Sequence, residues 1–295
     1  MRLLVTGAAG MLGHDVLRVG EHAGHELIAI DLPELDITDA RAVDTFFERE
    51  RPEGCVNCAA WTDVDGAESK QELARAVNAT GAGNLARAAA QIGAPLLHIS
   101  TDYVFDGAAP LDDAGHERPY VESDPTGPRS VYGSTKLEGE LQVLAASTRH
   151  TVVRTAWLYG LNGKNFVDTM LRLAHEREAT GSTPSVQVVD DQVGSPTWSG
   201  HLAPAILGLL EREVHGLVHL TGSGAVSWNG FAKEIFRQAE VECRVERASS
   251  EQMARPAPRP AYSVLESERD DVLPMPPWED GLAGYLAARD GMMRA

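Results

Sequence analysis

The chain begins with a short apolar run followed by three regularly spaced glycines, and this pattern restricts the fold more than any other feature. Residues 2–5, Arg-Leu-Leu-Val, have the composition of a buried parallel strand, and apolar residues at helical spacing follow the glycines. Gly7 permits a tight turn, Gly10 lets the backbone approach a pyrophosphate, and Gly13 lets the helix pack close to the strand. The sequence therefore predicts a strand, a turn and a helix whose free amides face phosphate groups.

The spacing of these glycines leaves an alternative open. It is GxxGxxG, whereas the longer-studied dehydrogenase loop is GxGxxG. An ordinary turn between a strand and a helix also contains glycines, so the loop alone does not establish a nucleotide site. A second signal further along the chain is needed.

The next expected strand bears on the choice of dinucleotide. It covers residues 26–30 and ends at Asp31, eighteen residues after Gly13, about where a carboxylate would hold the ribose hydroxyls. A carboxylate there repels a 2′-phosphate and so favours NAD over NADP, although a solvated loop acid is the alternative. Asp36 and Ile37 follow as candidate adenine contacts.

Strands and helices then alternate in the way that a doubly wound α/β sheet requires. We expect strands at 54–57, 95–99 and 151–155, and helices at 73–90 and 131–144. The segment 107–130 is rich in Pro, Gly and Asp and is too long for a plain connection, which indicates a surface excursion near the site. The predicted fold is a Rossmann-type doubly wound parallel sheet.

The last third of the chain predicts a smaller, interleaved lobe. Strands are expected at 186–189 and 217–220, and helices at 202–210 and 228–239. We therefore divide the chain into a dinucleotide-binding domain at 1–160 and a mainly substrate-binding lobe at 161–295, part of which returns to the first domain.

Charge and composition exclude several classes of partner. The formal net charge is −17, with 43 acidic against 26 basic residues, which argues against nucleic acid and anionic membranes. No apolar run is long enough to span a bilayer, and the first residues lead directly into a strand, so cytosol is the expected compartment. Three cysteines fit a reducing compartment, and the ten histidines form no spaced cluster for zinc.

A helical Tyr/Lys pair supplies the second signal. Tyr132 and Lys136 are four residues apart and project from one helical face. A phenol with a pKa near ~10 is a poor acid at neutral pH, and a neighbouring ammonium lowers that pKa. Thr101 follows the strand at 95–99, so its hydroxyl lies at the carboxyl edge of the sheet and can bind a substrate carbonyl oxygen beside the phenol. A surface helical pair is the alternative for YxxxK alone, but the order of the three motifs favours a nicotinamide-dependent enzyme.

With these motifs in place, the chain resembles the extended short-chain dehydrogenase/reductase family over nearly its whole length. Beyond the glycine loop, the resemblance rests on residues 100–105, 132–136, 154–159, 165–166, 190–197 and 259–260. The first two of these blocks are shared with many members of the family. The blocks at 101–105 and 191–197 are closer to members that reduce a dTDP-4-keto-6-deoxyhexose with NADPH or NADH, which implies this activity and this substrate.

The resemblance also implies roles for individual residues. Thr101, Tyr132 and Lys136 would be the catalytic set. The residues that would line the cofactor, besides Tyr132 and Lys136, are Gly7, Gly10, Met11, Leu12, Gly13, Asp31, Asp36, Ile37, Ala59, Ala60 and Asn78. Those that would lie near the sugar nucleotide, besides Thr101, are Asp102, Trp157, Asn165, Gln192 and Arg259.

Two of these expectations keep an alternative. Arg259 lies in the stiff segment 256–260 and can pair with a diphosphate through its two-pronged guanidinium, or it can be an ordinary exposed arginine. Some family members dimerise around a magnesium ion held by an acid on the first helix, and Asp15 occupies the matching place here. A surface acid is the simpler interpretation of Asp15, so no metal ligand is assigned, and Mg²⁺ and a homodimer stay open.

Rival functions on the same fold differ in their residues. Sugar-nucleotide dehydratases pair Asp with Glu directly after the Thr, whereas Tyr103 follows Asp102 here, which disfavours elimination. A 4-epimerase, another 4-ketoreductase and a non-catalytic subunit resembling the regulatory subunit of methionine adenosyltransferase remain. Epimerases retain NAD tightly through turnover, and the intact catalytic set argues against the non-catalytic subunit.

Overall fold

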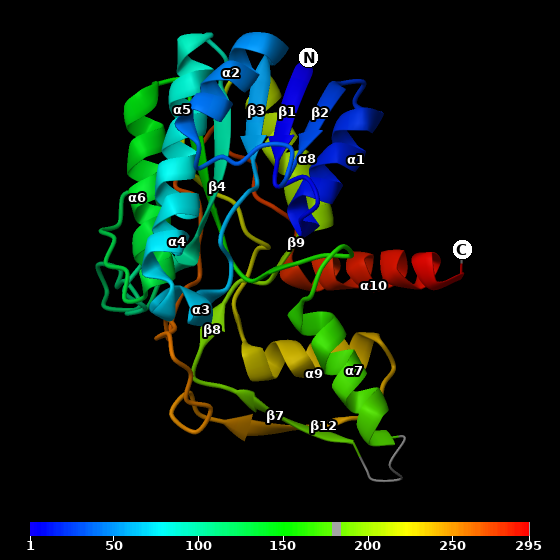
Figure 1. The fold of residues 1–295 in the computed structure, drawn as a ribbon. Coiled ribbons are helices and arrows are strands. Elements are labelled where there is room, and N and C mark those ends of the chain that lie inside the picture. Colours follow the sequence, from blue (N-terminus) through cyan, green and yellow to red (C-terminus); the bar gives the residue numbers. More distant parts are fainter. Residues whose placement is uncertain (179–183, 295) are drawn as a thin grey trace.

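A six-stranded parallel sheet forms the centre of the larger part of the molecule (Figure 1). The computed structural model describes residues 1–178 and 184–294. The strand order is β10-β5-β4-β3-β1-β2. All strands are parallel, and successive strands are added on one side of β1 up to β2 and on the other side from β3 onward. The strands are β1 (Arg2–Thr6), β2 (Glu26–Ile30), β3 (Gly54–Asn57), β4 (Leu96–Thr101), β5 (Thr151–Thr155) and β10 (Gly216–His219). In a doubly wound sheet, ligands bind where the order reverses, so the topology places the site above β1 and β3.

Both faces of this sheet are buried, as the apolar strand sequences require. In β1, Leu3 and Val5 face α1 (Met11–His22) and α8 (Ser199–Glu211), while Leu4 faces the opposite core. That opposite core is covered by α2 (Ala40–Glu50), α5 (Ala82–Gln91) and α6 (Val131–Ala146). The predicted Rossmann-type α/β fold is confirmed.

The helix expected at 73–90 is not one regular helix. It consists of α4 (Gln71–Arg75), a π-helical turn η1 (Ala76–Gly81) and α5, and it is preceded by the short helix α3 (Val64–Ser69). A π turn holds one extra residue within the helix, which composition does not reveal. Its Asn78 side chain is fully buried behind the loop that follows β3.

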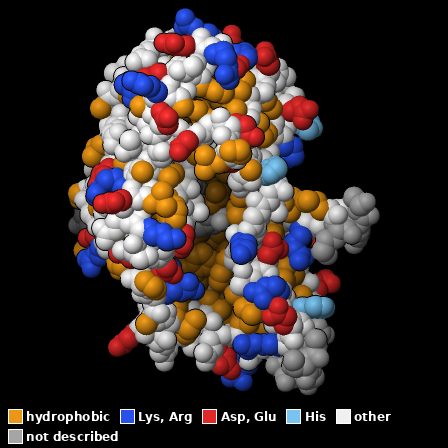
Figure 2. All heavy atoms as spheres, viewed as in Figure 1, with side chains coloured by type: hydrophobic (Ala, Val, Ile, Leu, Met, Phe, Trp, Pro, Cys, Tyr) orange, Lys and Arg blue, Asp and Glu red, His pale blue; other side chains and the backbone are white. Residues whose placement is uncertain are grey.

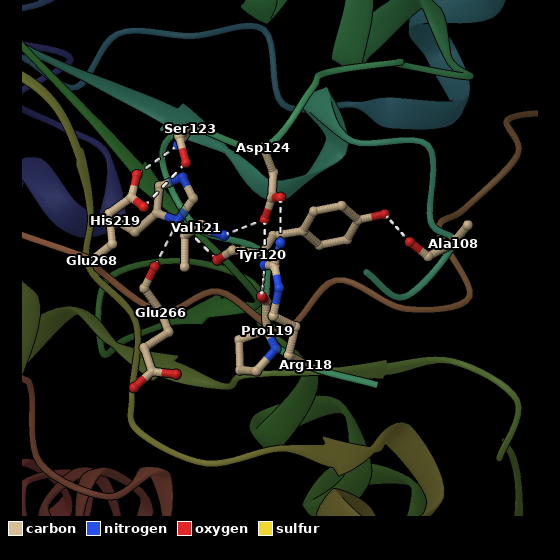
Figure 3. Close-up of polar contacts among 10 residues, drawn as sticks. All are labelled: Ala108, Arg118, Pro119, Tyr120, Val121, Ser123, Asp124, His219, Glu266 and Glu268. Atoms are coloured by element: carbon tan, nitrogen blue, oxygen red, sulfur yellow. Dashed lines mark hydrogen bonds and ion pairs between the residues drawn. The ribbon is translucent and has the colours of Figure 1, made fainter. Parts of the chain in front are cut away.

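The excursion at 107–130 is tied to a distant part of the chain, as Figure 3 shows. It follows a single turn of 3-10 helix, η2 (Asp102–Val104). Tyr120 exchanges backbone hydrogen bonds with Val264 and Glu266 and donates its hydroxyl to the carbonyl of Ala108. His219, at the end of β10, contacts the Tyr120 and Glu266 carbonyls through its Nδ1. The excursion therefore connects the carboxyl edge of the sheet to the C-terminal third.

The remaining elements form a smaller lobe beside the carboxyl edge of the sheet (Figure 1). It contains a parallel pair, β7 (Ser185–Val189) and β12 (Arg244–Ala248), and the helices α7 (Phe166–Glu178), α9 (Trp228–Gln238) and α10 (Trp278–Arg294). Two short ladders join β6 (Leu158–Tyr159) to β9 (Thr197–Trp198) and β8 (Val193–Gly194) to β11 (Val226–Ser227). The elements α8 and β10 pack with the main sheet instead. Within the described residues, no helix is both long and apolar enough to cross a membrane.

Candidate active site

A cavity of about 970 Å³ lies where the strand order reverses and extends toward the C-terminal lobe. Figure 2 shows the molecule hollowed between its two parts, with hydrophobic side chains along the hollow. The structure brings most of the predicted site residues to the wall of this cavity. These are Gly7, Gly10, Met11, Leu12, Gly13, Asp31, Asp36, Ile37, Ala59, Ala60, Thr101, Asp102, Tyr132, Lys136 and Trp157.

The glycine loop forms one end of the cavity, and its geometry requires glycine. Gly7 has a φ of 67°, and a Cβ added there would lie 2.5 Å from the backbone nitrogen of Ala59. A Cβ at Gly13 would lie 2.2 Å from the carbonyl oxygen of Gly7. Helix α1 begins after Gly10 without any side-chain cap, so its first amides are available to an anion. The loop therefore fits the phosphates of a dinucleotide.

Three acidic or apolar residues form the rim beyond the loop. Asp31 accepts hydrogen bonds from the backbone nitrogens of Ala9 (3.0 Å) and Leu32 (2.9 Å), so its carboxylate braces the glycine loop. Asp36 accepts hydrogen bonds from the amide and the hydroxyl of Thr38. Ile37 is buried, with only 7% of its surface exposed. Part of the hydrogen-bonding capacity of Asp31 is thus used within the protein.

Helix α6 brings Tyr132 to the end of β4 because small residues let the two approach. The hydroxyl of Ser130 caps the helix by accepting a hydrogen bond from the backbone N–H of Gly133 at 3.1 Å. A Cβ at Gly133 would lie 2.2 Å from the carbonyl oxygen of Tyr103, so a larger residue would push α6 away. A buried ion pair between Glu140 and Arg154, at 2.7 Å, fixes the same helix to β5.

The Tyr132 phenol and the Thr101 hydroxyl interact at the cavity wall. Burial raises the pKa of Tyr132 to about 12, and the hydrogen bond with Thr101 opposes this increase. The charge of Asp102 raises the same pKa further. A positive charge placed in the cavity would lower the pKa, which is the condition for the phenol to act as an acid.

Lys136 lies deeper than Tyr132 and is almost completely buried. Its Nζ donates to the carbonyl oxygen of Ile99 at 2.6 Å and lies 3.3 Å from Nε2 of His98. Burial lowers its pKa to about 8, and the nearby Glu140 carboxylate opposes this decrease. The ammonium is therefore close to losing its proton at moderately alkaline pH.

Two buried polar atoms on the cavity wall have no partner among the described residues. They are Oδ2 of Asp102 and Oγ1 of Thr155. Burial raises the pKa of Asp102 to about 6, while the hydrogen bond from the Thr101 hydroxyl to the other oxygen, Oδ1, opposes the increase. Buried polar groups are nearly always paired, so these two atoms indicate where a ligand's polar groups would bind.

An aromatic stack forms the wall toward the C-terminal lobe. Trp157 has a φ of 46°, which is rare for a bulky residue, and its ring lies on that of Trp228 with centroids 3.6 Å apart. The close contact with Gly194 leaves no room for a Cβ at that position. Unusual backbone geometry of this kind gathers at ligand sites. Trp228 lines the cavity as well.

Three predicted contact residues, Asn78, Asn165 and Gln192, do not line this cavity, and their ligand contacts stay predictions. Asn78 clamps the backbone of Trp61 through hydrogen bonds in both directions. Asn165 donates to the carbonyl oxygen of Gly160 at 2.9 Å and caps the start of α7. Gln192 donates to the hydroxyl of Ser250. Each amide is hydrogen-bonded to the backbone or to side chains of this chain, as buried amides need partners.

Arg259 also lies outside the cavity wall, and an internal carboxylate occupies it. Its two terminal nitrogens donate to Asp65 of α3, each at 3.0 Å, and Arg255 approaches the same carboxylate at 3.4 Å. The hydrogen bonds from Arg259 are the main reason that the pKa of Asp65 is lowered to about 2. The pair joins the sheet domain to segment 256–260 of the C-terminal third.

The structure gives Asp15 a role within the protein. The residue is buried, accepts a 2.6 Å hydrogen bond from the Ser199 hydroxyl, and pairs with Arg18. The interpretation of Asp15 as a surface acid is therefore wrong. In the described part of the chain, no group of three or more His, Cys, Asp or Glu side chains is placed to hold a metal ion.

Several cavity residues were not identified from the sequence. Trp61, Trp228 and Lys164 all line the cavity. Trp61 follows directly after Ala59 and Ala60, and Lys164 directly precedes Asn165, so each adjoins a predicted contact residue. Their position next to a predicted contact residue could have indicated that they line the cavity. No such sequence signal indicated Trp228, because its stacking partner Trp157 is distant in sequence.

Comparison with known proteins identifies the family. The sequence profile described as RmlD substrate binding domain matches residues 1–290. A dTDP-4-dehydrorhamnose reductase from Mycobacterium tuberculosis is 45% identical over 296 residues, covering 97% of this chain and 93% of that protein. A dTDP-4-keto-6-deoxy-D-glucose reductase from Streptomyces niveus is 42% identical over 266 residues, covering 90% and 88%. The crystal structure of a dTDP-4-dehydrorhamnose reductase from Bacillus anthracis in complex with NADP matches with a TM-score of 0.90 at 37% identity, covering 97% and 99%. The chain therefore belongs to the RmlD substrate binding domain family, within the extended short-chain dehydrogenases/reductases that its motifs resemble.

Proposed function

We propose that this protein reduces the C4 ketone of dTDP-4-dehydro-β-L-rhamnose to dTDP-L-rhamnose, using NADPH or NADH. The observation that carries the proposal is that Thr101, Tyr132 and Lys136 line the same cavity as the glycine loop. A relative named for this reaction is 45% identical over nearly the whole chain.

The dinucleotide would be held at the end of the cavity formed by the glycine loop. The uncapped amides at the start of α1 would bind its pyrophosphate, and Asp31, Asp36 and Ile37 would face its adenosine. When bound, it supplies a hydride to the ketone carbon. The NADP complex of the Bacillus anthracis relative supports NADPH, whereas the carboxylate of Asp31 favours NADH, so the proposal includes both.

Tyr132 would supply the proton that balances the hydride. Thr101 would donate its hydroxyl to the carbonyl oxygen and so hold it beside the phenol. The pKa of Tyr132 is about 12 in the protein alone, so the phenol is protonated before the reaction. The ammonium of Lys136 would stabilise the phenolate that forms when the proton leaves.

The sugar nucleotide would occupy the part of the cavity toward the C-terminal lobe. The stacked Trp157 and Trp228 provide an apolar wall for a 6-deoxyhexose, whose methyl group is apolar. Arg259 would exchange Asp65 for the substrate diphosphate, since a guanidinium binds either anion in the same two-pronged way. This assigns residues 1–160 mainly to the cofactor and 161–295 mainly to the substrate.

The role of Arg259 has its own test. Arg259→Ala should weaken dTDP binding by about 10- to 100-fold, because a charge-assisted pair contributes on the order of 1.5–3 kcal/mol. Isothermal titration with dTDP measures this effect, and NADPH affinity serves as the control. Unchanged dTDP affinity would remove Arg259 from the substrate site.

A second candidate is reduction of a related dTDP-4-keto-6-deoxy sugar. The Streptomyces niveus relative bears such a name at 42% identity. The two candidates share chemistry and differ in the sugar stereoisomer accepted. A dehydratase is disfavoured because Tyr103 stands where a second carboxylate would follow Asp102.

The deciding experiment follows the absorbance of the reduced nicotinamide with dTDP-4-keto-6-deoxy sugars, with and without the partner epimerase that makes the L-configured ketone. NADH and NADPH are compared in parallel. Net oxidation that depends on the epimerase and yields dTDP-L-rhamnose would support the first candidate. Oxidation without the epimerase would favour the related sugar, and tightly retained NAD with no net oxidation would indicate an epimerase. Co-purification with a synthetase and no turnover would indicate a regulatory subunit.

A further inference from the structure

A chain of buried polar side chains crosses the sheet directly behind the catalytic lysine. The Thr6 hydroxyl of β1 donates to Oδ1 of Asn57 in β3 at 2.8 Å. Nδ2 of Asn57 lies 2.9 Å from Nδ1 of His98 in β4, and Nε2 of His98 lies 3.3 Å from Nζ of Lys136. His98 is completely buried. The reaction proposed above does not use this histidine.

The orientation of the Asn57 amide is set by a backbone donor. The N–H of Ala59 lies 3.0 Å from Oδ1 of Asn57, and a backbone nitrogen can only donate. The oxygen of the amide must therefore face Ala59 and Thr6. The NH₂ group consequently faces His98 and donates to its Nδ1.

The orientation of Asn57 determines the tautomer of His98. Burial and the neighbouring Lys136 lower the pKa of His98 well below its ordinary value, so the ring is neutral. A neutral imidazole carries one N–H, and Nδ1 accepts from Asn57. The hydrogen is therefore on Nε2, which faces Lys136.

This tautomer distinguishes between the two charge states of Lys136. An ammonium has three donors and no acceptor, so it leaves the buried Nε2–H of His98 unpaired. A neutral amine accepts that hydrogen and still donates to the carbonyl oxygen of Ile99. We propose that His98, oriented by Asn57, favours the neutral form of Lys136 and thereby sets the pH at which the catalytic lysine loses its charge.

The other groups around Lys136 act in different directions. Glu140, on the same helix, favours the ammonium, although its carboxylate also binds Arg154 of β5 and the Ser100 hydroxyl. The Cys58 thiol, after β3, also favours the ammonium, while burial opposes it. Among these neighbours, His98 is the one that presents a fixed N–H to the amine.

Lysine NMR on the protein without cofactor tests this inference independently of activity. The chain has only four lysines, Lys70, Lys136, Lys164 and Lys233, so ¹³Cε-labelled lysine gives few signals, and Lys136→Met assigns the relevant one. In Asn57→Asp, the carboxylate would accept a hydrogen bond from an N–H at Nδ1 of His98. The ring would then carry its hydrogen on Nδ1, and Nε2 would become an acceptor. The pH midpoint at which the ¹³Cε signal of Lys136 titrates should then rise by about one pH unit, a ~10-fold change in proton affinity.

A double variant separates the tautomer from the added charge of Asn57→Asp. In the His98→Phe background, the same substitution adds the charge but has no imidazole to reorient. A shift that disappears in this background supports the inference, and a shift of equal size in both backgrounds overturns it. The signals of the other three lysines should not respond to either substitution.

The unmodified protein provides a second test if a variant fails to fold. The ¹⁵N spectrum of the histidine rings reports which nitrogen of His98 carries hydrogen, and a hydrogen on Nδ1 would overturn the inference. The effect on catalysis rests on the proposed function, where the alkaline limit of kcat should move with the NMR transition. If the NMR shift appears but no keto sugar is reduced, the proposed function fails and the inference about His98 stands.

Discussion

The two ends of the cavity differ in how their residues are used by the protein itself. At the cofactor end, the predicted loop residues reach the cavity and leave the amides of α1 uncapped. Toward the C-terminal lobe, the side chains predicted to contact the substrate, Asn165, Gln192 and Arg259, lie outside the cavity wall and already have partners within the chain. The first end is therefore formed by exposed backbone, whereas the predicted polar contacts at the other end are side chains interlocked with other parts of the chain. Backbone sites can be inferred from glycine spacing, whereas interlocked side chains depend on contacts that form only on folding.

The largest expected effect concerns the residue at the junction of the two ends. Tyr132→Phe should lower kcat by about 10²- to 10⁴-fold, because the proton donor is lost while the ring remains. Stopped-flow or steady-state measurement of NADPH oxidation gives the effect. NADPH affinity and Tm should stay near those of the unmodified protein. Full reductase activity in this variant would show that the phenol is not the acid.

The backbone character of the cofactor end can be tested at Gly7. Gly7→Ala should destabilise the fold by about 3 kcal/mol and weaken NADPH binding, because the Cβ meets Ala59 and φ is 67°. Gly208→Ala is a matched control, since its Cβ enters open space on helix α8 and should stabilise the fold by about 0.5–1 kcal/mol. Urea unfolding and NADPH titration measure both. Equal behaviour of the two variants would contradict the close-approach argument.

Asp102 predicts an unusual dependence of stability on pH. Its pKa in the folded protein is about 6 against an ordinary 3.8, so the folded state binds this proton more tightly than the unfolded state. The stabilisation is complete below about pH 4 and is lost as the pH rises through about 6, by on the order of 3 kcal/mol. Urea unfolding at a series of pH values measures this loss. Asp102→Asn should abolish it, and Asp113→Asn, at an exposed position, should retain it.

Retention of the loss in Asp102→Asn would assign the effect to another group. If Asp102→Asn abolishes the pH dependence and also reduces turnover, the Asp102 carboxylate destabilises the fold at neutral pH but is needed for the reaction. Asp102 differs from the residues at both ends, because one of its oxygens is paired within the protein and the other is unpaired.

The smallest expected effect belongs to the substrate end. Trp228→Leu removes the ring that supports Trp157 and should raise the KM for the keto sugar by about 10-fold, while NADPH affinity stays the same. Trp61→Leu is the control, because Trp61 lines the cavity next to Ala59 and Ala60, and this variant should leave the KM for the keto sugar unchanged. If Trp228→Leu changed NADPH affinity as much as substrate KM, the stack would belong to the cofactor end.

The parts of the site that could be predicted from the sequence are built from residues close together along the chain. Gly7, Gly10 and Gly13 reached the cavity because one strand-turn-helix unit determines their positions. Asn78 lies in a π turn and its side chain is hydrogen-bonded to Trp61, so its contact with the cofactor stays a prediction. The family was confirmed by the comparisons. The homodimer, the division at residue 160 and the cytosolic location stay predictions.

By itself, the sequence determined the alternation of elements, the glycine loop and the order of Thr101, Tyr132 and Lys136 along the chain. These follow from local spacing, since apolar periodicity and turn residues act over a few positions. Only the tertiary structure decided that Trp228 supports Trp157, that Asp65 occupies Arg259, and that Asn57 orients His98 toward Lys136. Each of these joins residues far apart in sequence, and buried polar groups and rings find their partners only when the elements pack together.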